Sequence, residues 1–362
     1  MVKIWCSISS HGYGHAAQVI PILNELGQRI PDAEVILRTT VPREFFEHKL
    51  HGNWVIQEKQ QDIGCLQQGP LEIDIDGTWK AYQHFHQGWA DNVKKEAEAI
   101  RDNEIDLVIS NISHFGIAAG IEAGLPTVAI ASLSWDQILL NLRPLHARWQ
   151  QDILREIQEA YGQASHLIRL FPGIDMPAFP RSSNVGPSFL SLPTKTSDIR
   201  TILSLSPDDR LVLVAFGGVP FGHLPLNALQ ALEGFHFIVS GVPVPDAFTR
   251  ISCWESLNVP FLEALSQSDL VMTKPGYSTI VTAIHYGTPI IYVRRDNFVE
   301  EANLVDYAHQ YGRAYELSRE DFQSGSWEHA LMRVMEHPLP RLSPPQNGAK
   351  TATDILKTFL NK

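Results

Sequence analysis

Short apolar runs alternate with helical patterns along the chain. The first run, residues 2–8, reads Val-Lys-Ile-Trp-Cys-Ser-Ile and predicts a buried strand. Residues 16–29 then place Val19, Leu23 and Leu26 on one helical face. The same alternation predicts strands at 34–38, 54–57, 106–110 and 127–131, and helices at 89–101, 114–123 and 137–165, the last broken at Pro144. Strands separated by helices favour a doubly wound parallel sheet over a sandwich.

A stretch rich in Pro and Ser, residues 172–207, interrupts this alternation. The pattern then restarts, with strands predicted at 211–216, 236–240, 270–273 and 289–293, and helices at 228–232, 278–286 and 349–360. We interpret the interruption as the passage between two α/β domains, residues 1–180 and 181–345. Two such halves predict a cleft between them, because open α/β sheets bind ligands outside the carboxyl ends of their strands.

The composition restricts the classes of partner. The chain has 362 residues and a formal charge of −11, which argues against nonspecific nucleic-acid binding and against electrostatic docking on an anionic membrane. Its three cysteines show no C-x-x-C spacing, so neither a disulfide framework nor a zinc site is predicted. No apolar run approaches the roughly 18 residues of a membrane span, and the first strand leaves no room for a signal peptide. We therefore expect a soluble, reduced, cytoplasmic protein.

A turn rich in glycine and histidine follows the first predicted strand. Residues 9–17 read Ser-Ser-His-Gly-Tyr-Gly-His-Ala-Ala and open the first helix. Glycines such as Gly14 let the backbone approach a ligand closely, and a helix N-terminus favours negative charge. Two imidazoles, His11 and His15, are suited to proton transfer near neutral pH. The alternative is a tight turn whose histidines only cap or pack.

Two glycine turns occupy similar positions in the second half. Gly217 and Gly218 follow a predicted strand and can present backbone N–H groups to phosphate, although the G-K-[ST] of a P-loop is missing. An ordinary turn is the alternative there. The second turn reads Lys-Pro-Gly-Tyr-Ser-Thr over residues 274–279, and its Ser and Thr can cap the next helix. The free N–H groups of that helix would then face an anion.

Four polar residues follow the next predicted strand, near the same edge of the sheet: Asp296, Asn297, Glu300 and Glu301. Their oxygens are acceptors that suit the hydroxyls of a sugar. The alternative is a solvated run of charges beside a capped helix.

Seven short motifs in this order resemble those of GT-B glycosyltransferases. They resemble more closely the glycosyltransferase-like N-terminal region of plant-type L-arabinokinases. The residues that carry the resemblance are 9–17, 132–136, 168–170, 176–179, 216–218, 274–279 and 293–301. No galactokinase-type domain follows in this sequence, so the resemblance implies no sugar-kinase activity. It implies a GT-B fold of two Rossmann-like domains facing across a cleft, with the C-terminal helix, 346–362, packing back on the first domain.

The resemblance also implies roles for individual residues. His15 matches the position of the general base, with His11 in reserve. Lys274 would offset the charge of the donor diphosphate. The other residues implied in nucleotide and phosphate binding are Gly14, Gly217, Gly218, Val259, Phe261, Gly276, Tyr277, Ser278 and Thr279. Those implied in binding the donor sugar are Asp296, Asn297, Glu300 and Glu301. No metal or other cofactor is implied, and the D-x-D spelling at Asp74 and Asp76 is assigned to a loop.

The predicted function is transfer of a sugar from a nucleoside-diphosphate sugar, with UDP the expected nucleotide, to an unidentified acceptor hydroxyl. The resemblance implies an inverting, metal-independent reaction. Two departures from the resembling families leave alternatives open. Thr282 replaces a ribose-binding Glu, and Asn111 replaces an Asp that supports the catalytic His, a role for which Asp136 and His114 are candidates. The alternatives are a noncatalytic nucleotide-sugar sensor and a nucleotide-sugar hydrolase or epimerase. Aromatic residues at 79–89 are one candidate for the acceptor site, and ordinary packing is the other interpretation.

Overall fold

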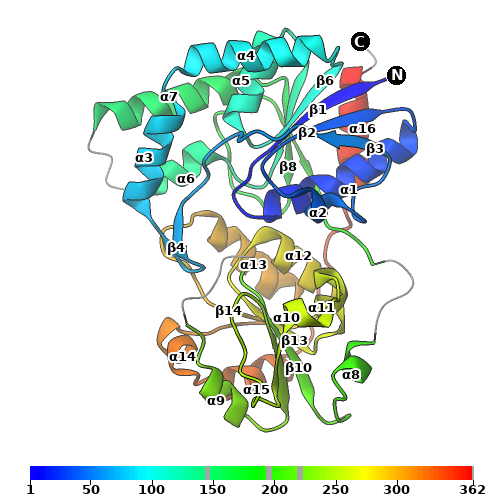
Figure 1. Ribbon diagram of the computed structural model, residues 1–362, viewed down its shortest axis with the longest axis vertical. Coiled ribbons are helices and arrows are strands. Elements are labelled where there is room, and N and C mark those ends of the chain that lie inside the picture. Colours follow the sequence, from blue (N-terminus) through cyan, green and yellow to red (C-terminus); the bar gives the residue numbers. More distant parts are fainter. Residues whose placement is uncertain (143–146, 193–197, 218–222, 361–362) are drawn as a thin grey trace.

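The chain forms two α/β halves that meet at an interface containing α1 (Gly14–Arg29) and α12 (Tyr277–Tyr286) (Figure 1). The computed structural model describes residues 1–142, 147–192, 198–217 and 223–360. Both large sheets are parallel throughout their described strands. The prediction of two doubly wound halves is therefore confirmed.

In the described residues, the first sheet has seven strands in the order β3-β2-β1-β6-β7-β8-β9. These are β1 (Lys3–Ile8), β2 (Glu34–Arg38), β3 (Asn53–Ile56), β6 (Leu107–Asn111), β7 (Thr127–Ala131), β8 (His166–Leu170) and β9 (Ser182–Val185). The helices of this half, besides α1, are α2 (Arg43–Phe46), α3 (Ile75–Phe85), α4 (Trp89–Asp102), α5 (His114–Glu122), α6 (Trp135–Asn141) and α7 (Arg148–Gln163). A small antiparallel hairpin, β4 (Gln67–Gly69) and β5 (Glu72–Ile73), extends toward the second half (Figure 1).

The second sheet has six described strands in the order β12-β11-β10-β13-β14-β15. These are β10 (Arg210–Val214), β11 (Phe235–Val239), β12 (Ile251–Cys253), β13 (Leu270–Thr273), β14 (Ile290–Tyr292) and β15 (Ala314–Glu316). The remaining helices are α8 (Ile199–Ile202), α9 (Leu226–Ala231), α10 (Trp254–Leu257), α11 (Phe261–Gln267), α13 (Glu300–Tyr311), α14 (Arg319–Ser324), α15 (Glu328–Glu336) and α16 (Ala349–Leu360). Among the described helices, none is long and apolar enough to cross a membrane.

Burial on both faces explains why the central strands read as continuous apolar runs. Every residue of β6, β7, β11 and β13 is buried, because helices cover both sides of each parallel sheet. Helix α1 is also apolar on more than one face. It packs against β6, α12 and α16, so Val19, Ile20, Ile22 and Leu23 are all buried.

Two elements differ from the sequence prediction. Helix α3 replaces the expected loop, and Asp74 caps it by accepting a hydrogen bond from the Gly77 N–H at 2.8 Å. Strand β9 belongs to the first sheet although it lies beyond residue 180, the expected end of the first domain. The helical stretch expected at 137–165, with its break at Pro144, corresponds to two helices, α6 and α7; Pro144 itself lies outside the described residues.

The C-terminal helix α16 packs on α1 of the first half, as expected. The Thr353 hydroxyl donates to the Ile22 carbonyl at 3.3 Å, and Asp354 pairs with Arg29. The segment entering α16 lies directly beside the segment leaving β9. The Gly348 N–H donates to the Pro187 carbonyl at 2.7 Å, and the backbones at Gly186 and Gly348 are so close that neither has room for a Cβ.

Candidate active site

The glycine turns of the two halves meet at the carboxyl ends of the central strands. The Ser278 hydroxyl, in α12, donates to the Gly14 carbonyl, in α1, at 3.1 Å. A Cβ placed on Gly12 would lie 4.0 Å from the Gly217 carbonyl oxygen, and one on Gly217 would lie 3.5 Å from Cε of Lys274. The structure thus brings together the three turns that the sequence singled out.

His15 lies in the first turn of α1 and is 6% exposed. Its Nδ1 is 2.7 Å from Oδ1 of Asn111, the last residue of β6. The Asn111 amide nitrogen donates to Gln18 and to the Ile130 carbonyl, so its oxygen is the atom left to face His15. Nδ1 of His15 therefore carries the proton, and Nε2 holds the free lone pair. Burial lowers the pKa of His15 to about 4, so the ring is neutral at pH 7.

His11 adopts the opposite tautomer. The Cys65 N–H donates to Nδ1 of His11 at 3.1 Å, so Nε2 carries the proton. Burial is the main influence that lowers the pKa of His11 well below its usual value, and the nearby cationic side chains Lys274 and Arg295 lower it further. His11 is thus arranged to donate a hydrogen bond from Nε2 rather than to accept a proton there, which disagrees with its reserve assignment as the base.

Asp136 and His114 do not replace the missing carboxylate beside His15. The Asp136 oxygens accept from Ser134 at 2.5 Å, from Gln137 at 3.0 Å and from Gln158 at 3.5 Å. Nε2 of His114 is 3.2 Å from Nε2 of His86. The residue beside the His15 ring is Asn111 itself.

A buried carboxylate that the sequence analysis did not select, Asp62, lies beneath the first turn. It accepts from the Ser9 hydroxyl at 2.9 Å and from the Trp135 indole N–H at 2.8 Å. Burial raises the pKa of Asp62 to about 6. The Trp135 ring packs 5.3 Å from His11 and 5.5 Å from His15, so Asp62 supports both imidazoles through Trp135. No motif marks Asp62 in the sequence, because its partners lie at positions 9 and 135.

The facing turn of the second half is cationic. Lys274 is 9% exposed, and burial together with the charge of Arg295 lowers its pKa to about 7. Arg295, also missed as a site residue, lies behind it. Its guanidinium pairs with Glu301 at 2.6 Å, donates to the Pro275 carbonyl at 2.8 Å and covers the Phe298 ring at 3.8 Å. This buried pair holds the 274–276 turn in place.

Gly276, not Ser278 or Thr279, is the N-cap of α12. Within the described chain no side chain caps this helix, so its first N–H groups are left for another partner. The Tyr277 side chain is committed elsewhere: its hydroxyl donates to the Phe171 carbonyl at 2.9 Å and accepts from the Ser188 N–H at 3.1 Å. Only the backbone of Tyr277 can serve the nucleotide role expected of it.

The remaining predicted nucleotide residues are placed only in part. Gly217 has a positive φ of 76°, which favours glycine, and Gly218 lies outside the described residues. Val259 is buried, and its carbonyl accepts from the Trp254 indole at 2.8 Å. Phe261 begins α11 and packs edge-on against the Trp254 ring. These residues lie beyond β12, at the same end of the second sheet as Lys274.

The four expected sugar-binding residues divide into three kinds. Glu301 is held by Arg295, and Glu300 accepts from the Ser132 hydroxyl of the first half at 2.6 Å. Asp296 is exposed and pairs with Arg319 at 3.2 Å. With Asn297 and the β4–β5 hairpin it lines a pocket of about 240 Å³. Within the described residues, Glu300 is the member of the four that hydrogen-bonds to a side chain of the first half.

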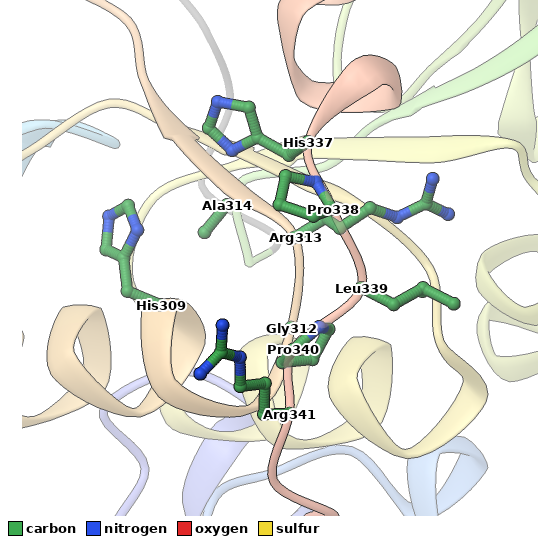
Figure 2. Close-up of a pocket in the computed structure, with 9 residues that line it drawn as sticks. All are labelled: His309, Gly312, Arg313, Ala314, His337, Pro338, Leu339, Pro340 and Arg341. Carbon is green, nitrogen blue, oxygen red and sulfur yellow. The ribbon is translucent and has the colours of Figure 1, made fainter.

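Two other regions lie apart from this site. Trp79 and Tyr82 of the aromatic stretch are buried in the core of the first half, which favours ordinary packing. A pocket of about 360 Å³ at the start of β15 has His309, His337 and Arg341 among its lining residues (Figure 2). It shares no residue with the active-site candidates. Among the described residues, no cluster of three or more His, Cys, Asp or Glu side chains is arranged to hold a metal ion.

Comparison with known proteins supports the two resemblances stated from the motifs. No protein-family model matches the sequence. The chain is 26% identical over 356 residues to L-arabinokinase of Arabidopsis thaliana; the match covers 97% of this chain and 34% of that protein. The chain therefore spans about a third of the length of this curated relative.

Solved glycosyltransferase structures share the fold. The calicheamicin glycosyltransferase CalG4 matches with a TM-score of 0.65 and 17% identity, over 100% of this chain and 99% of that one. A UDP-glucosyltransferase of Polygonum tinctorium matches with a TM-score of 0.66 and 13% identity, over 100% and 99%. UGT71G1 of Medicago truncatula, solved with UDP-glucose, matches with a TM-score of 0.62 and 14% identity, over 99% and 93%. The chain has the GT-B fold of these enzymes.

Proposed function

We propose that this protein is a glycosyltransferase that moves a sugar from a nucleoside-diphosphate sugar to an acceptor hydroxyl, with His15 as the general base. The observation that carries the proposal is the His15 tautomer. A neutral imidazole with its Nδ1 proton held by Asn111 presents the Nε2 lone pair, the arrangement a base requires. The turn that carries His15 meets the cationic turn of the opposite half, which is suited to a leaving diphosphate.

In the proposed reaction, Nε2 of His15 takes the proton from the acceptor hydroxyl. The acceptor oxygen attacks the anomeric carbon of the donor sugar, a new C–O bond forms, and the bond to the diphosphate breaks. The nucleoside diphosphate leaves with the electron pair. Lys274 and the N–H groups at the start of α12 would stabilise its charge. Attack and departure on opposite faces of the carbon would invert its configuration.

UDP is the proposed nucleotide. The support is that solved relatives of the same fold are complexed with UDP-2-fluoro-glucose, UDP-glucose or UDP. The proposed transfer draws its positive charge from protein groups, so we expect it to proceed without added divalent metal. The acceptor is proposed only as a hydroxyl compound.

Product analysis tests the proposal. Purified protein is incubated with a panel of UDP-, GDP- and TDP-sugars, each with and without a mixed hydroxyl acceptor library, in the presence and absence of EDTA. A glycosylated product that needs the acceptor and survives EDTA supports transfer. Free sugar or an epimer without acceptor would indicate a hydrolase or epimerase instead. Binding of a donor without any turnover would indicate a nucleotide-sugar sensor.

A further inference from the structure

Four hydrogen bonds join His15 to Glu300 across the interface between the halves. His15 Nδ1 is 2.7 Å from Asn111 Oδ1, and Asn111 Nδ2 is 3.0 Å from Gln18 Oε1. Gln18 Nε2 is then 2.9 Å from the Ser132 hydroxyl, which is 2.6 Å from Glu300 Oε1. All five residues are buried, so water does not compete for these bonds.

The donors of this chain all point the same way. Asn111 and Gln18 each accept through the side-chain oxygen and donate through the side-chain nitrogen. The second hydrogen bond donated by Asn111, to the Ile130 carbonyl, fixes the orientation of its amide. The single proton of Ser132 goes to Glu300, because Ser132 already accepts from Gln18. The chain therefore begins at the Nδ1–H of His15 and ends on a carboxylate.

We propose that Glu300 is a positioning residue for His15, acting from the opposite half through Ser132, Gln18 and Asn111. The inference rests on the proposed function and extends it. The Asn111 side chain is an amide, so the group that accepts from the His15 ring is not a carboxylate. The row of hydrogen bonds connects the ring instead to the more distant carboxylate of Glu300. Aligned hydrogen bonds strengthen one another when a charge develops at one end. When Nε2 of His15 takes up a proton, its Nδ1–H becomes a stronger donor. The aligned hydrogen bonds, which end at the Glu300 carboxylate, would then stabilise the positive charge on the ring.

The same geometry couples the base to the donor side. Glu300 is the first residue of α13, and its Oε1 is used by Ser132. Its Oε2 has no hydrogen-bond partner in the described part of the chain, and can accept from a donor-sugar hydroxyl. The row of hydrogen bonds from His15 to Glu300 is continuous only while the two halves are in contact. Glu300 can therefore act on His15 only when the halves are closed on each other.

The charged groups near both ends are few. Burial is the main influence on Glu300 and raises its pKa to about 7, with Arg295 and Glu301 as its charged neighbours. His11 is the titratable neighbour of His15, with ring centroids 6.3 Å apart, and it is neutral. Measurements at pH 8 therefore keep Glu300 ionised and both histidines uncharged.

The first test uses the protein alone. The ¹⁵N shifts of the His15 ring and the ¹H shift of its Nδ1–H are recorded at pH 8, where Glu300 is ionised, in the wild type, Ser132→Ala, Glu300→Gln and the matched control Ser134→Ala. Ser134 is an equally buried serine whose hydroxyl donates to Asp136, outside the hydrogen-bond chain. We expect a single Nδ1–H tautomer in the wild type and control, and a lower ¹H shift of the Nδ1–H, as for a weaker hydrogen bond, in Ser132→Ala and Glu300→Gln. An unchanged Nδ1–H shift in both variants overturns the proposal, whether or not the protein proves to be a transferase.

The second test uses turnover with whichever donor and acceptor give product. Ser132→Ala should lower kcat by about tenfold, the loss expected for one hydrogen bond serving a charged group, with little change in the donor KM. Asn111→Asp places a carboxylate directly beside His15. In that background Ser132→Ala should have no further effect on kcat. Equal losses in both backgrounds would show that Ser132 acts through the general packing of the interface, and would overturn the proposal.

Discussion

The two turns that face each other across the interface are built alike but behave differently on burial. Each follows a central parallel strand, contains glycine and opens a helix that, within the described residues, no side chain caps. Burial lowers the pKa of His15 to about 4 and that of Lys274 to about 7. At neutral pH the same physical effect fixes His15 in its neutral form but leaves Lys274 between its two forms. We therefore expect the His15 turn to be in its working protonation state before a ligand binds, and the Lys274 turn to reach full charge only when an anion binds.

The test with the largest expected effect removes the neutral imidazole of His15. His15→Ala should lower kcat by about 10²–10⁴-fold, the usual contribution of a general base. The affinity for UDP, measured by calorimetry, should stay near the wild-type value, because His15 lies on the opposite half from Lys274. His51→Ala, at an exposed histidine of the first half, is the control. Equal losses of turnover and UDP affinity would assign His15 a structural role.

A second test concerns how the cationic turn is held. Glu301→Ala leaves the buried Arg295 guanidinium without its carboxylate, and should lower the free energy of unfolding by about 3–5 kcal/mol. Urea denaturation measures this loss, with Glu320→Ala, at an exposed glutamate, as the control. An unchanged free energy of unfolding in Glu301→Ala would show that the Arg295–Glu301 pair does not hold this turn.

A third test removes the Lys274 side chain, whose charge we expect a bound anion to stabilise. Lys274→Ala should weaken UDP binding by about 10- to 100-fold, corresponding to about 1.5–3 kcal/mol for a charge-assisted hydrogen bond. Lys350→Ala, on the exposed face of α16, is the matched control. Unchanged UDP affinity in Lys274→Ala would place the diphosphate elsewhere.

The smallest expected effect is the uptake of a fraction of a proton when UDP binds. Because burial lowers the pKa of Lys274 to about 7, a bound diphosphate should restore its charge. UDP binding at pH 7 should therefore take up about half a proton, and affinity should fall as pH rises above 7. Calorimetry in buffers of different ionisation enthalpy measures the uptake. Below pH 6 the lysine is already charged, and uptake by this group should vanish; uptake that persists in Lys274→Ala would point to another group.

The sequence predicted the strands and turns because each depends on neighbouring residues. The apolar runs at β1, β6 and β13 and the glycine turns after β1 and β13 are local signals, and the structure brings those turns together. Strand β9 was missed because Ser-Ser-Asn-Val is a polar edge strand with no apolar run. Helix α3 was missed because Asp74 was considered for its D-x-D spelling rather than as a cap.

The site chemistry was harder to predict because it depends on partners far apart in the chain. Tyr277 was assigned to the diphosphate from its motif, but Phe171 and Ser188 hold its hydroxyl. In the sequence, Asn111 stands where the resembling families have an Asp, which suggested a weakened catalytic site. Its meaning changes once Gln18, Ser132 and Glu300 are seen in line with it, residues spread from 18 to 300 that no local pattern connects.

The contact between Gly186 and Gly348 has a mechanical consequence. The chain passes from the first sheet to the second and returns once more to α16, and these two connections touch where neither glycine has room for a side chain. Two backbone segments in such close contact can bend together more easily than they can slide past each other. A separation of the halves that keeps this contact would therefore hinge beside Gly186 and Gly348. Closure about that hinge would bring the same two turns back together.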